Sequence, residues 1–325
     1  MPTLSYIEAI SRAMWEEMER DPSVFLLGED IGAYGGAFKA TKGFLDHFGE
    51  QRVIDTTLSE AGILGAAIGA AVVGMRPIAE MQFADFVTCG FNQLVSNAAK
   101  IHYRWNLPVP MVVRLPAGGY IHGGPYHSEN PEAWFFHVPG LKIVAPSTPY
   151  DAKGLLKAAV RDPNPVLFLE YKYLYRRIKG GVPADDYVVP IGRGDVKRDG
   201  DDLAIITYGS TVHFSLEAAA ILAKEDGIET RVVDLRSLKP LDVDLILDSV
   251  KATGKVLIVH EDHLTGGIGG EVAALIAERA FQYLDAPVRR LGSLDTPVPF
   301  APTLENHVLP DAQKILEALR VLNRF

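Results

Sequence analysis

Cysteine and long apolar runs are both scarce in this sequence. Cys89 is the one cysteine, which excludes an internal disulfide, argues against a thiolate metal site and suits a reducing compartment. The longest apolar run is interrupted at Arg76 and Glu80, so no stretch approaches the roughly 18 residues that cross a bilayer. The first residues enter an acidic amphipathic segment directly and lack the features of a signal peptide. We therefore expect a cytoplasmic protein.

Positive charge is also in short supply. Lysine and arginine number 32 against 41 aspartates and glutamates, which gives a formal net charge of −9. Nonspecific nucleic-acid binders and proteins of anionic membranes depend on a positive field, so the charge argues against both classes. The rest of the composition, with 48% hydrophobic and 22% charged residues, is that of an ordinary globular protein. At 325 residues the chain exceeds the usual size of one hydrophobic core, and two domains are expected.

Segments of helical period alternate with short apolar runs along the whole chain, which predicts an α/β architecture with mainly parallel strands. In the first half, Ser5 followed by Glu8 is a capping box that begins a helix. The strands expected after it are 24–27, 78–83, 111–115, 143–145 and 166–170, and the helices are 86–103 and 150–160.

A second series of the same kind follows residues 171–190, a stretch rich in Lys, Arg, Gly and Pro that predicts a linker. Its expected strands are 203–208, 230–235, 256–260 and 288–291, and its expected helices are 214–224, 243–250, 271–283 and 311–322. The sequence thus predicts two α/β domains with mainly parallel sheets, one over about 1–188 and the other over 189–325.

The stretch 55–62 places one carboxylate, Glu60, between a predicted strand end and a nearly pure apolar run. Gly65 and Gly69 in that run would let another backbone approach closely, so we expect Glu60 to open a buried helix. Burying an ionisable group without a partner is costly, and perturbed acids concentrate at functional sites. The alternative is that Glu60 caps the helix or pairs with an Arg or Lys. The residues alone leave both interpretations open.

Two other segments carry side chains suited to chemistry. Phe83 and Phe86 lie at predicted element ends and could be core residues, although an aromatic face also suits a flat heterocycle. His127 lies in the segment 118–128, which is too rich in glycine for a packed element and too long for a plain turn. A histidine exchanges a proton near neutral pH, but a lone histidine in a loop is usually a surface residue.

The sequence His260-Glu-Asp-His263 raises the question of a metal site. Its two histidines lie at a predicted strand end rather than on one helix face, so they lack the geometry of an HExxH zinc site. The glycine run 265–270 that follows resembles a dinucleotide-binding loop only loosely and arrives late in the chain. We expect neither a metal site nor a nicotinamide site here.

Several long motifs occur in one order over nearly the whole chain. They are LGEDIG with GGAFKATKG (27–43), DTTLSEAGILGAAIGAAVVGMRPIAEMQFADF (55–86), YHSENPEAWFFHVPGLKIVAPSTPYDAKGLL (126–156), DPNPVLFLE (162–170) and VVDLRSLKPLD (232–242). With them the chain resembles the β subunit of thiamine-diphosphate-dependent 2-oxo acid dehydrogenases, in the transketolase-like superfamily. The resemblance implies a pyrimidine-binding N-terminal domain, a smaller transketolase C-terminal-like domain, thiamine diphosphate as cofactor, and an α2β2 assembly with active sites between α and β.

The resemblance also assigns roles to individual residues. The family glutamate at the position of Glu60 hydrogen-bonds the pyrimidine ring of the cofactor, and the aromatic at Phe86 packs on that ring. Gln82 belongs to the same cofactor-binding segment. The histidine of the YHS motif, His127 here, handles the substrate and transfers the acyl group to lipoyl. His122 matches no family role.

Two metal ions follow from the resemblance. The family holds a structural potassium ion through hard oxygen ligands, and the matching residues here are Met111, Ala159, Val160, Asp162 and Asn164. An ordinary turn at a helix end is the alternative. For Mg²⁺ the family uses a Gly-Asp-Gly motif followed by paired asparagines, and this sequence has neither. We therefore expect an α subunit to hold Mg²⁺ and the diphosphate, and a single-chain transketolase or deoxyxylulose-phosphate synthase is excluded.

The activity implied by the resemblance is oxidative decarboxylation of a 2-oxo acid. The acyl group would pass to the lipoyl acyltransferase core, which would bind through its subunit-binding domain. YHSENPEAWFFHVPG and HEDHLTGGIGGE are closer to branched-chain β subunits than to pyruvate ones, so 3-methyl-2-oxobutanoate is the preferred substrate and pyruvate the alternative. A pocket discriminates one methylene by only about 1–3 kcal/mol. A third interpretation, a non-catalytic scaffold, is disfavoured because Glu60, Phe86 and His127 are all retained.

Overall fold

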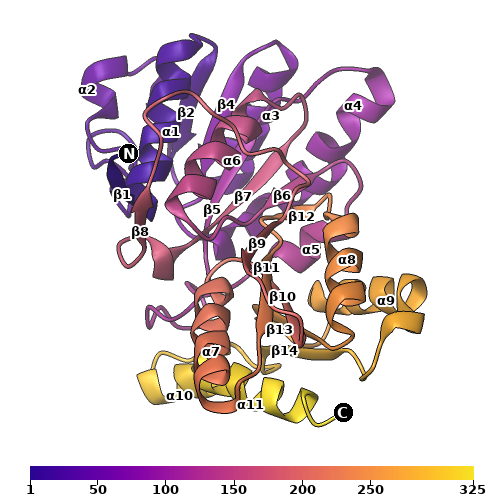
Figure 1. The fold of residues 1–325 in the computed structure, drawn as a ribbon. Helices are drawn as coiled ribbons and strands as arrows, with labels where there is room; N and C mark the ends of the chain where they lie inside the picture. Colours follow the sequence, from indigo (N-terminus) through magenta and orange to yellow (C-terminus); the bar gives the residue numbers. More distant parts are fainter. The chain divides into compact units, whose positions relative to one another are not determined.

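The computed structural model describes residues 1–325 and divides into two units (Figure 1). Unit 1 comprises Met1–Ala117 and Trp134–Ile191, and unit 2 comprises Gly118–Ala133 and Gly192–Phe325. The sequence predicts a single boundary near residue 188, whereas contacts within the structure group the segment Gly118–Ala133 with the C-terminal part of the chain. That segment is the loop that carries His127.

Unit 1 is built on a parallel sheet whose strands follow the order β6-β7-β5-β4-β2-β3. Strands β2, β5 and β7 are buried along their whole length, which explains why their sequences are mainly apolar rather than alternating; the charged exceptions are Arg114 in β5 and Glu170 in β7. The bounds are β2 (Val24–Gly28), β3 (Val53–Asp55), β4 (Arg76–Glu80), β5 (Val112–Ala117), β6 (Lys142–Val144) and β7 (Val166–Tyr171).

The predicted N-terminal helix is confirmed, and both hydrogen bonds of its capping box are present between Ser5 and Glu8. It packs side by side with the second long helix of unit 1, as Figure 1 shows for α1 and α6. The helices of unit 1 are α1 (Tyr6–Arg20), α2 (Phe44–Phe48), α3 (Glu60–Val72), α4 (Ala99–Trp105) and α6 (Pro149–Arg161); α5 (Glu132–Phe136) spans the division between the units.

The single helix predicted over 86–103 is wrong in detail. The chain forms the 3-10 helix η1 (Ala84–Gly90), then the π-helix η2 (Gln93–Ala98), and only then α4. Gly90 ends the 3-10 segment against α3, and a Cβ there would clash with the Leu64 side chain and lie 3.3 Å from the Glu60 carbonyl. Close packing on the first turns of α3 therefore accompanies the irregular winding, which hydrophobic periodicity cannot reveal.

Residues 171–190 are packed against unit 1. β8 (Lys179–Gly181) pairs antiparallel with β1 (Thr3–Ser5), and η3 (Lys172–Leu174) follows β7. Further along, Lys153 donates to the Pro183 carbonyl over 3.0 Å and Arg161 pairs with Asp186 at 2.8 Å. The polar composition of this stretch therefore serves hydrogen bonds and ion pairs with α6.

Unit 2 contains a five-stranded sheet in the order β14-β13-β10-β11-β9, in which only β9 is antiparallel to its neighbour. The strands are β9 (Asp195–Arg198), β10 (Leu203–Thr207), β11 (Thr230–Asp234), β13 (Val256–His263) and β14 (Arg289–Ser293), and β12 (Ser237–Lys239) follows β11. The helices are α7 (Thr211–Asp226), α8 (Val243–Thr253), α9 (Gly269–Arg279), η4 (Phe281–Tyr283), α10 (Pro302–Val308) and α11 (Ala312–Leu322).

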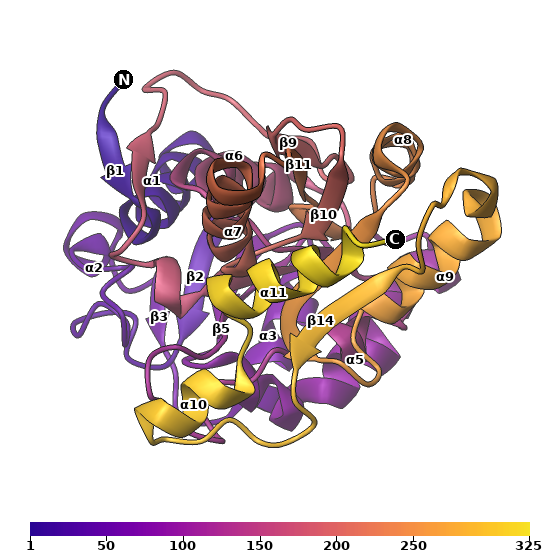
Figure 2. The ribbon, with the colours of Figure 1, turned by 60° about the horizontal axis from the view of Figure 1, so that its bottom comes forward.

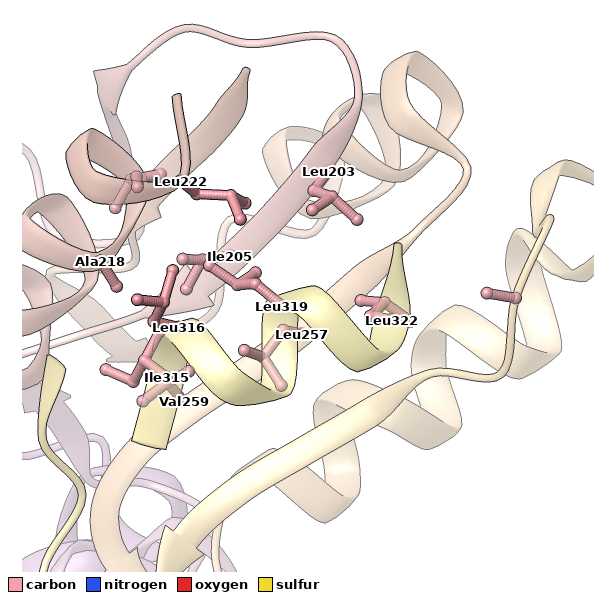
Figure 3. Close-up of a cluster of buried hydrophobic side chains, with 13 residues drawn as sticks. Leu203, Ile205, Ala218, Leu222, Leu257, Val259, Ile315, Leu316, Leu319 and Leu322 are labelled. Carbon is pink, nitrogen blue, oxygen red and sulfur yellow. The ribbon is translucent and has the colours of Figure 1, made fainter. Parts of the chain in front are cut away.

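The core of unit 2 lies where α7 and α11 meet β10, β11 and β13 (Figure 3). The last helix begins where it is expected, and Asp311 caps it, because the Asp311 side chain accepts from the Lys314 amide at 2.8 Å. Figure 2 shows α11 beside α7 and β14. Its four predicted core residues are all buried: Ile315, Leu316, Leu319 and Leu322. Across the structure, none of the helices has the combined length and apolar character that crossing a membrane requires.

Candidate active site

The carboxyl ends of β2, β3 and β4 carry a cluster of acidic residues. Parallel strands end at one edge of their sheet, and in open α/β folds ligands bind at that edge. The register places Gly28, Asp55 and Glu80 side by side across these three strands. Glu29 follows β2 directly, and Glu60 begins the helix that follows β3.

Glu60 is the first residue of α3, and its side chain is half-buried. The preceding Ser59 makes no side-chain cap, so the helix begins without a capping hydroxyl. The expectation of a fully buried helix is wrong for this chain: α3 buries one face, while nothing lies within 4 Å of a Cβ placed on Gly65 or Gly69. An apolar sequence indicates that a helix can be buried on several faces. In this chain, neighbouring elements cover only one face of α3.

Glu29 and Glu80 are the strongly buried carboxyls of this cluster, each with 5% of its surface exposed, and Glu29 is the one beside Glu60. Burial raises the pKa of Glu29, and the negative charges of Glu60 and Asp30 raise it further, while the Ser59 amide partly opposes them. No donor reaches either carboxylate oxygen with good hydrogen-bond geometry. The motif LGEDIG contains Glu29, but the sequence gives this residue no role, because no local pattern shows that an acid of this loop lies beside Glu60.

The loop after β2 is held firmly in place. Asp30 adopts a left-handed backbone with φ of 57°, and its side chain accepts from Gln82 Nε2 over 3.2 Å. The Gly32 amide donates to Asp55 Oδ1 over 2.6 Å. Gln82, predicted to bind the cofactor, thus links the loop after β2 to the segment after β4.

Phe86 lies in η1 and is partly buried against Phe83, with ring centroids 5.8 Å apart and an interplanar angle of 75°. Phe83 in turn contacts the Phe38 ring edge-on at 5.4 Å. Phe83 therefore belongs to an aromatic cluster of the kind expected for a core residue. Phe86 stands at the end of that cluster, in the 3-10 segment that packs on the first turns of α3.

A buried ionic network underlies this edge of the sheet and was missed by sequence reasoning. Arg114 of β5 makes two hydrogen bonds to Glu170 of β7, at 2.6 and 2.8 Å, and a further ion pair to Glu80 of β4. Tyr175 donates to the same Glu170 over 2.7 Å. Burial raises the pKa of Glu80, and Arg114 opposes that shift. One arginine thus fixes the side chain that ends β4, just before Gln82.

The five residues matched to a potassium site lie around the end of α6 and the start of β5. The Ala159 carbonyl accepts from the Asp162 amide at 3.3 Å, and the Met111 carbonyl accepts from the Val166 amide at 2.9 Å. The Val160 carbonyl accepts from Arg76 at 2.7 Å. The negative end of a helix dipole and several backbone oxygens thus meet here, and Arg76 already donates to two of them, those of Val160 and Asp162.

The Asp162 carboxylate at the same place is already engaged. Lys142 contacts Oδ2 at 2.5 Å, and Asn164 donates to Oδ1 from its backbone at 2.9 Å and from its side chain at 3.2 Å. His102 Nδ1 lies 2.6 Å from the Asn164 side-chain oxygen. An ion bound here would therefore be held by backbone oxygens rather than by the Asp162 side chain.

His127 belongs to unit 2, whereas Glu60, Gln82 and Phe86 belong to unit 1. Its amide donates to the Gly124 carbonyl over 3.3 Å. Gly123 packs so tightly that an added Cβ would lie 2.9 Å from the His127 carbonyl oxygen and 3.0 Å from its Cβ. The glycines that mark this loop in the sequence therefore serve close packing within it.

The two histidines of the HEDH sequence bond to the backbone. His260 is buried, its Nδ1 lies 3.0 Å from the Asp262 carbonyl oxygen, and burial lowers its pKa to about 4. His263 Nδ1 lies 3.1 Å from the Leu294 carbonyl oxygen. Gly267 and Gly269 pack directly on the His260 ring, since a Cβ on either would lie 2.6 Å from a ring atom. The glycine run thus makes room for a neutral imidazole.

A second buried acidic cluster lies in unit 2 at the end of β13. Burial raises the pKa of Glu132, and the nearby Asp262 raises it further. Tyr208 donates to Glu132 Oε1 over 3.0 Å. Burial also raises the pKa of Asp262, to about 6. Glu261 accepts from the Gly119 amide at 2.5 Å and from the Ser210 hydroxyl. These contacts tie both ends of the loop that carries His127 to the sheet of unit 2.

The chain matches two family models in succession. Residues 2–177 match the pyrimidine-binding domain of transketolase, and residues 192–315 match the transketolase C-terminal domain. A solved split-gene transketolase, described as an inactive β4 tetramer, superposes with a TM-score of 0.82 at 25% identity over 99% of each chain. The fold is thus that of the transketolase-like, thiamine-diphosphate-dependent class.

Curated relatives narrow this class. The chain is 58% identical to the 2-oxoisovalerate dehydrogenase subunit beta of Bacillus subtilis, over 100% of both chains. It is 45% identical to the pyruvate dehydrogenase E1 component subunit beta of the same organism, over 98% of this chain and 100% of the relative. The chain belongs to the β-subunit family of thiamine-diphosphate-dependent 2-oxo acid dehydrogenases.

Proposed function

We propose that this chain is the catalytic β subunit of a 2-oxo acid dehydrogenase that decarboxylates a branched-chain substrate, 3-methyl-2-oxobutanoate, and passes the acyl group to lipoyl. The observation that carries the proposal is the pair of acids Glu29 and Glu60 at the carboxyl edge of a parallel sheet, with Glu60 on the helix that packs against the 3-10 segment of Phe86. A scaffold has no need of a buried acid with raised pKa beside a second acid. The 58% identical relative, named for 2-oxoisovalerate, supports the branched-chain substrate.

The residues present fit the pyrimidine end of thiamine diphosphate. The Glu29 oxygens are buried with unfilled acceptor capacity, and Glu60 beside them is half-buried, so the pair can receive a heterocycle that carries N–H groups. When bound, the cofactor supplies the electron sink for decarboxylation. Glu60 would share a proton with the ring, Phe86 would pack on the ring face, and Gln82, held by Asp30, would line the site.

His127 would act on the substrate side of the reaction. Its glycine-rich loop is tied to the sheet of unit 2 through Glu261, so the ring is presented from an anchored loop. A neutral imidazole can accept a proton and an imidazolium can return it near pH 7. We assign His127 to substrate handling and to transfer of the acyl group to lipoyl.

A potassium ion would be held by the backbone oxygens of Met111, Ala159, Val160, Asp162 and Asn164. This site is supported by the carbonyl oxygens that lie close together at the end of α6, because each of them has a second lone pair that can bind a cation. The test is thermal unfolding of the purified protein in KCl, NaCl and choline chloride at one ionic strength. A site predicts a higher melting temperature in K⁺ alone. Equal melting in all three salts would mean that no potassium ion adds to the contacts that Arg76 already makes with these oxygens.

The partners follow from the same family. An α subunit would complete an α2β2 tetramer and hold Mg²⁺ and the diphosphate, since the chain lacks the Gly-Asp-Gly motif. The lipoyl acyltransferase core would dock through its subunit-binding domain. Co-expression with an α subunit of this enzyme family, followed by sizing of the purified complex, tests the tetramer.

The decisive experiment compares two substrates in the reconstituted tetramer. We expect kcat/KM for 3-methyl-2-oxobutanoate to exceed that for pyruvate by at least about 10–200-fold, the range that a pocket gains from one methylene. A preference for pyruvate would instead establish the alternative function, which the 45% identical pyruvate-type relative supports. A tetramer that binds thiamine diphosphate and turns over neither acid would establish a scaffold.

A further inference from the structure

Two residues of the loop Gly118–Ala133 hold a backbone conformation that side chains disfavour. Tyr120 has φ of 61° and His122 has φ of 58°. In this left-handed region the Cβ crowds the following carbonyl oxygen, so such residues persist only where their surroundings fix them. His127 lies further along the same loop. The contacts that fix His122 therefore also set the path of the chain toward His127.

Glu305 of α10 makes two contacts with His122. The His122 amide donates to Glu305 Oε1 over 3.2 Å, and ring atom Nδ1 lies 2.6 Å from Oε2. The Glu305 side chain is fully buried, whereas the His122 side chain is 49% exposed. A buried carboxylate is costly without a partner, so these two contacts stabilise the loop and the carboxylate together.

The neighbouring residues hold the same stretch against unit 2. Tyr120 donates to the Pro310 carbonyl over 2.6 Å, and its ring lies 5.1 Å from that of Phe214. A Cβ on Gly119 would lie 2.6 Å from Leu309 Cδ1 and 3.3 Å from Glu305 Oε1. The first part of the loop thus packs closely on the residues around α10, and Glu305 is the charged residue among these contacts.

We infer that Glu305 is a positioning residue for acyl transfer: by holding His122 in its left-handed conformation, it fixes the loop that presents His127. The inference rests on the proposed function of His127. Glu305 acts through His122, and α10 is thereby linked to the reaction although the sequence motifs gave it no role. The role requires that Glu305 Oε1 accept from the His122 amide and that Oε2 lie beside the His122 ring.

The test uses the reconstituted tetramer with four variants of the full chain: Glu305→Gln, Glu305→Ala, His122→Gly, and Glu305→Ala combined with His122→Gly. Glu317→Ala, at an exposed position on α11, is the matched control. Hydrogen exchange of the amides of 118–128 reports loop order without reference to activity. Acylation of a lipoyl domain, with kcat and KM measured separately, reports the reaction.

Glu305→Ala should speed exchange in the loop by about tenfold or more and lower kcat for acylation by about 10²-fold, with KM for the oxo acid little changed. Glu305→Gln retains an acceptor for the His122 amide and should lose much less. Glycine adopts positive φ freely, so Glu305→Ala should cost several-fold less in the His122→Gly background.

Unchanged loop exchange in Glu305→Ala, or an equal loss in both backgrounds, would overturn the inference. If Glu305→Ala fails to fold, the isosteric Glu305→Gln decides. Its neutral acceptor should still speed exchange of the loop amides measurably, and loop exchange and acylation kinetics identical to those of the wild type would overturn the inference. A wild-type tetramer inactive toward every 2-oxo acid would defeat the proposed function instead, and the exchange measurement would still report whether Glu305 fixes the loop.

Discussion

Replacing Glu60 by glutamine separates a catalytic role of this side chain from a structural one. Glutamine keeps the size and the hydrogen-bonding reach of Glu60 but cannot share a proton. Glu60 is half-buried at the first position of α3, so losing its charge removes at most the interaction with the helix dipole, about 0.3–1 kcal/mol. Losing the Glu60 charge also removes a repulsion from the Glu29 carboxylate, which is stabilising, because Glu60 is one of the charges that raise the Glu29 pKa. The free energy of unfolding should therefore change by less than about 1 kcal/mol.

The activity should change far more than the stability. Proton transfer by a positioned side chain contributes about 10²–10⁴-fold to a rate, which is about 3–5 kcal/mol of transition-state stabilisation. We expect the kcat of Glu60→Gln to fall by that factor in dye-linked decarboxylation by the reconstituted tetramer. Glu50→Gln, an exposed change in the same unit, serves as the control and should leave both quantities unchanged.

Two results would refute this reasoning. Near wild-type turnover by the glutamine variant would show that no shared proton is required of Glu60. Destabilisation well above about 1 kcal/mol, with activity lost in proportion to folded protein, would show that Glu60 serves as a helix cap or ion-pair partner. Denaturant unfolding of the isolated chain and kinetics of the tetramer distinguish these outcomes.

Further measurements address other parts of the molecule. His127→Ala should impair acylation of a lipoyl domain more than dye-linked decarboxylation, and equal loss in both assays would contradict a role in acyl transfer. The pKa values of Glu132 and Asp262 are raised, so the folded state binds protons more tightly than the unfolded state, and the stability should fall as the pH rises through about 6. Glu132→Gln should make the melting temperature less dependent on pH. The same dependence of melting temperature on pH in the variant and the wild type would contradict this prediction. Leu319→Ala should cost about 2–5 kcal/mol in denaturant unfolding, while Val321→Ala, on the exposed side of α11, should stay within about 0.5 kcal/mol. Deletion of residues 324–325 should weaken docking of the acyltransferase subunit-binding domain in a salt-dependent way, and unchanged affinity across a salt series would rule out this tail.

Several features of the site were predictable because they are local. The capping box of Ser5 and Glu8, the buried strands of both sheets and the start of α3 at Glu60 follow from side-chain chemistry within a few residues of each position. The sequence placed Phe86 after the strand that is β4, as the structure has it, but it put Gln82 within the expected strand 78–83, whereas β4 ends at Glu80. The irregular winding of 84–98 was not predictable, since it accompanies close packing of Gly90 on another helix.

The sequence by itself determined the period of each element, the caps that begin the helices and the family motifs, because these depend on residues close along the chain. Only the tertiary structure decided which charges are buried together: Glu29 beside Glu60, Arg114 between Glu80 and Glu170, and Glu305 against His122. The pKa and the orientation of a carboxylate depend on which distant elements remove it from water and which donors they bring. Sequence spacing carries no record of that arrangement until the sheets have formed and the loops have packed against them.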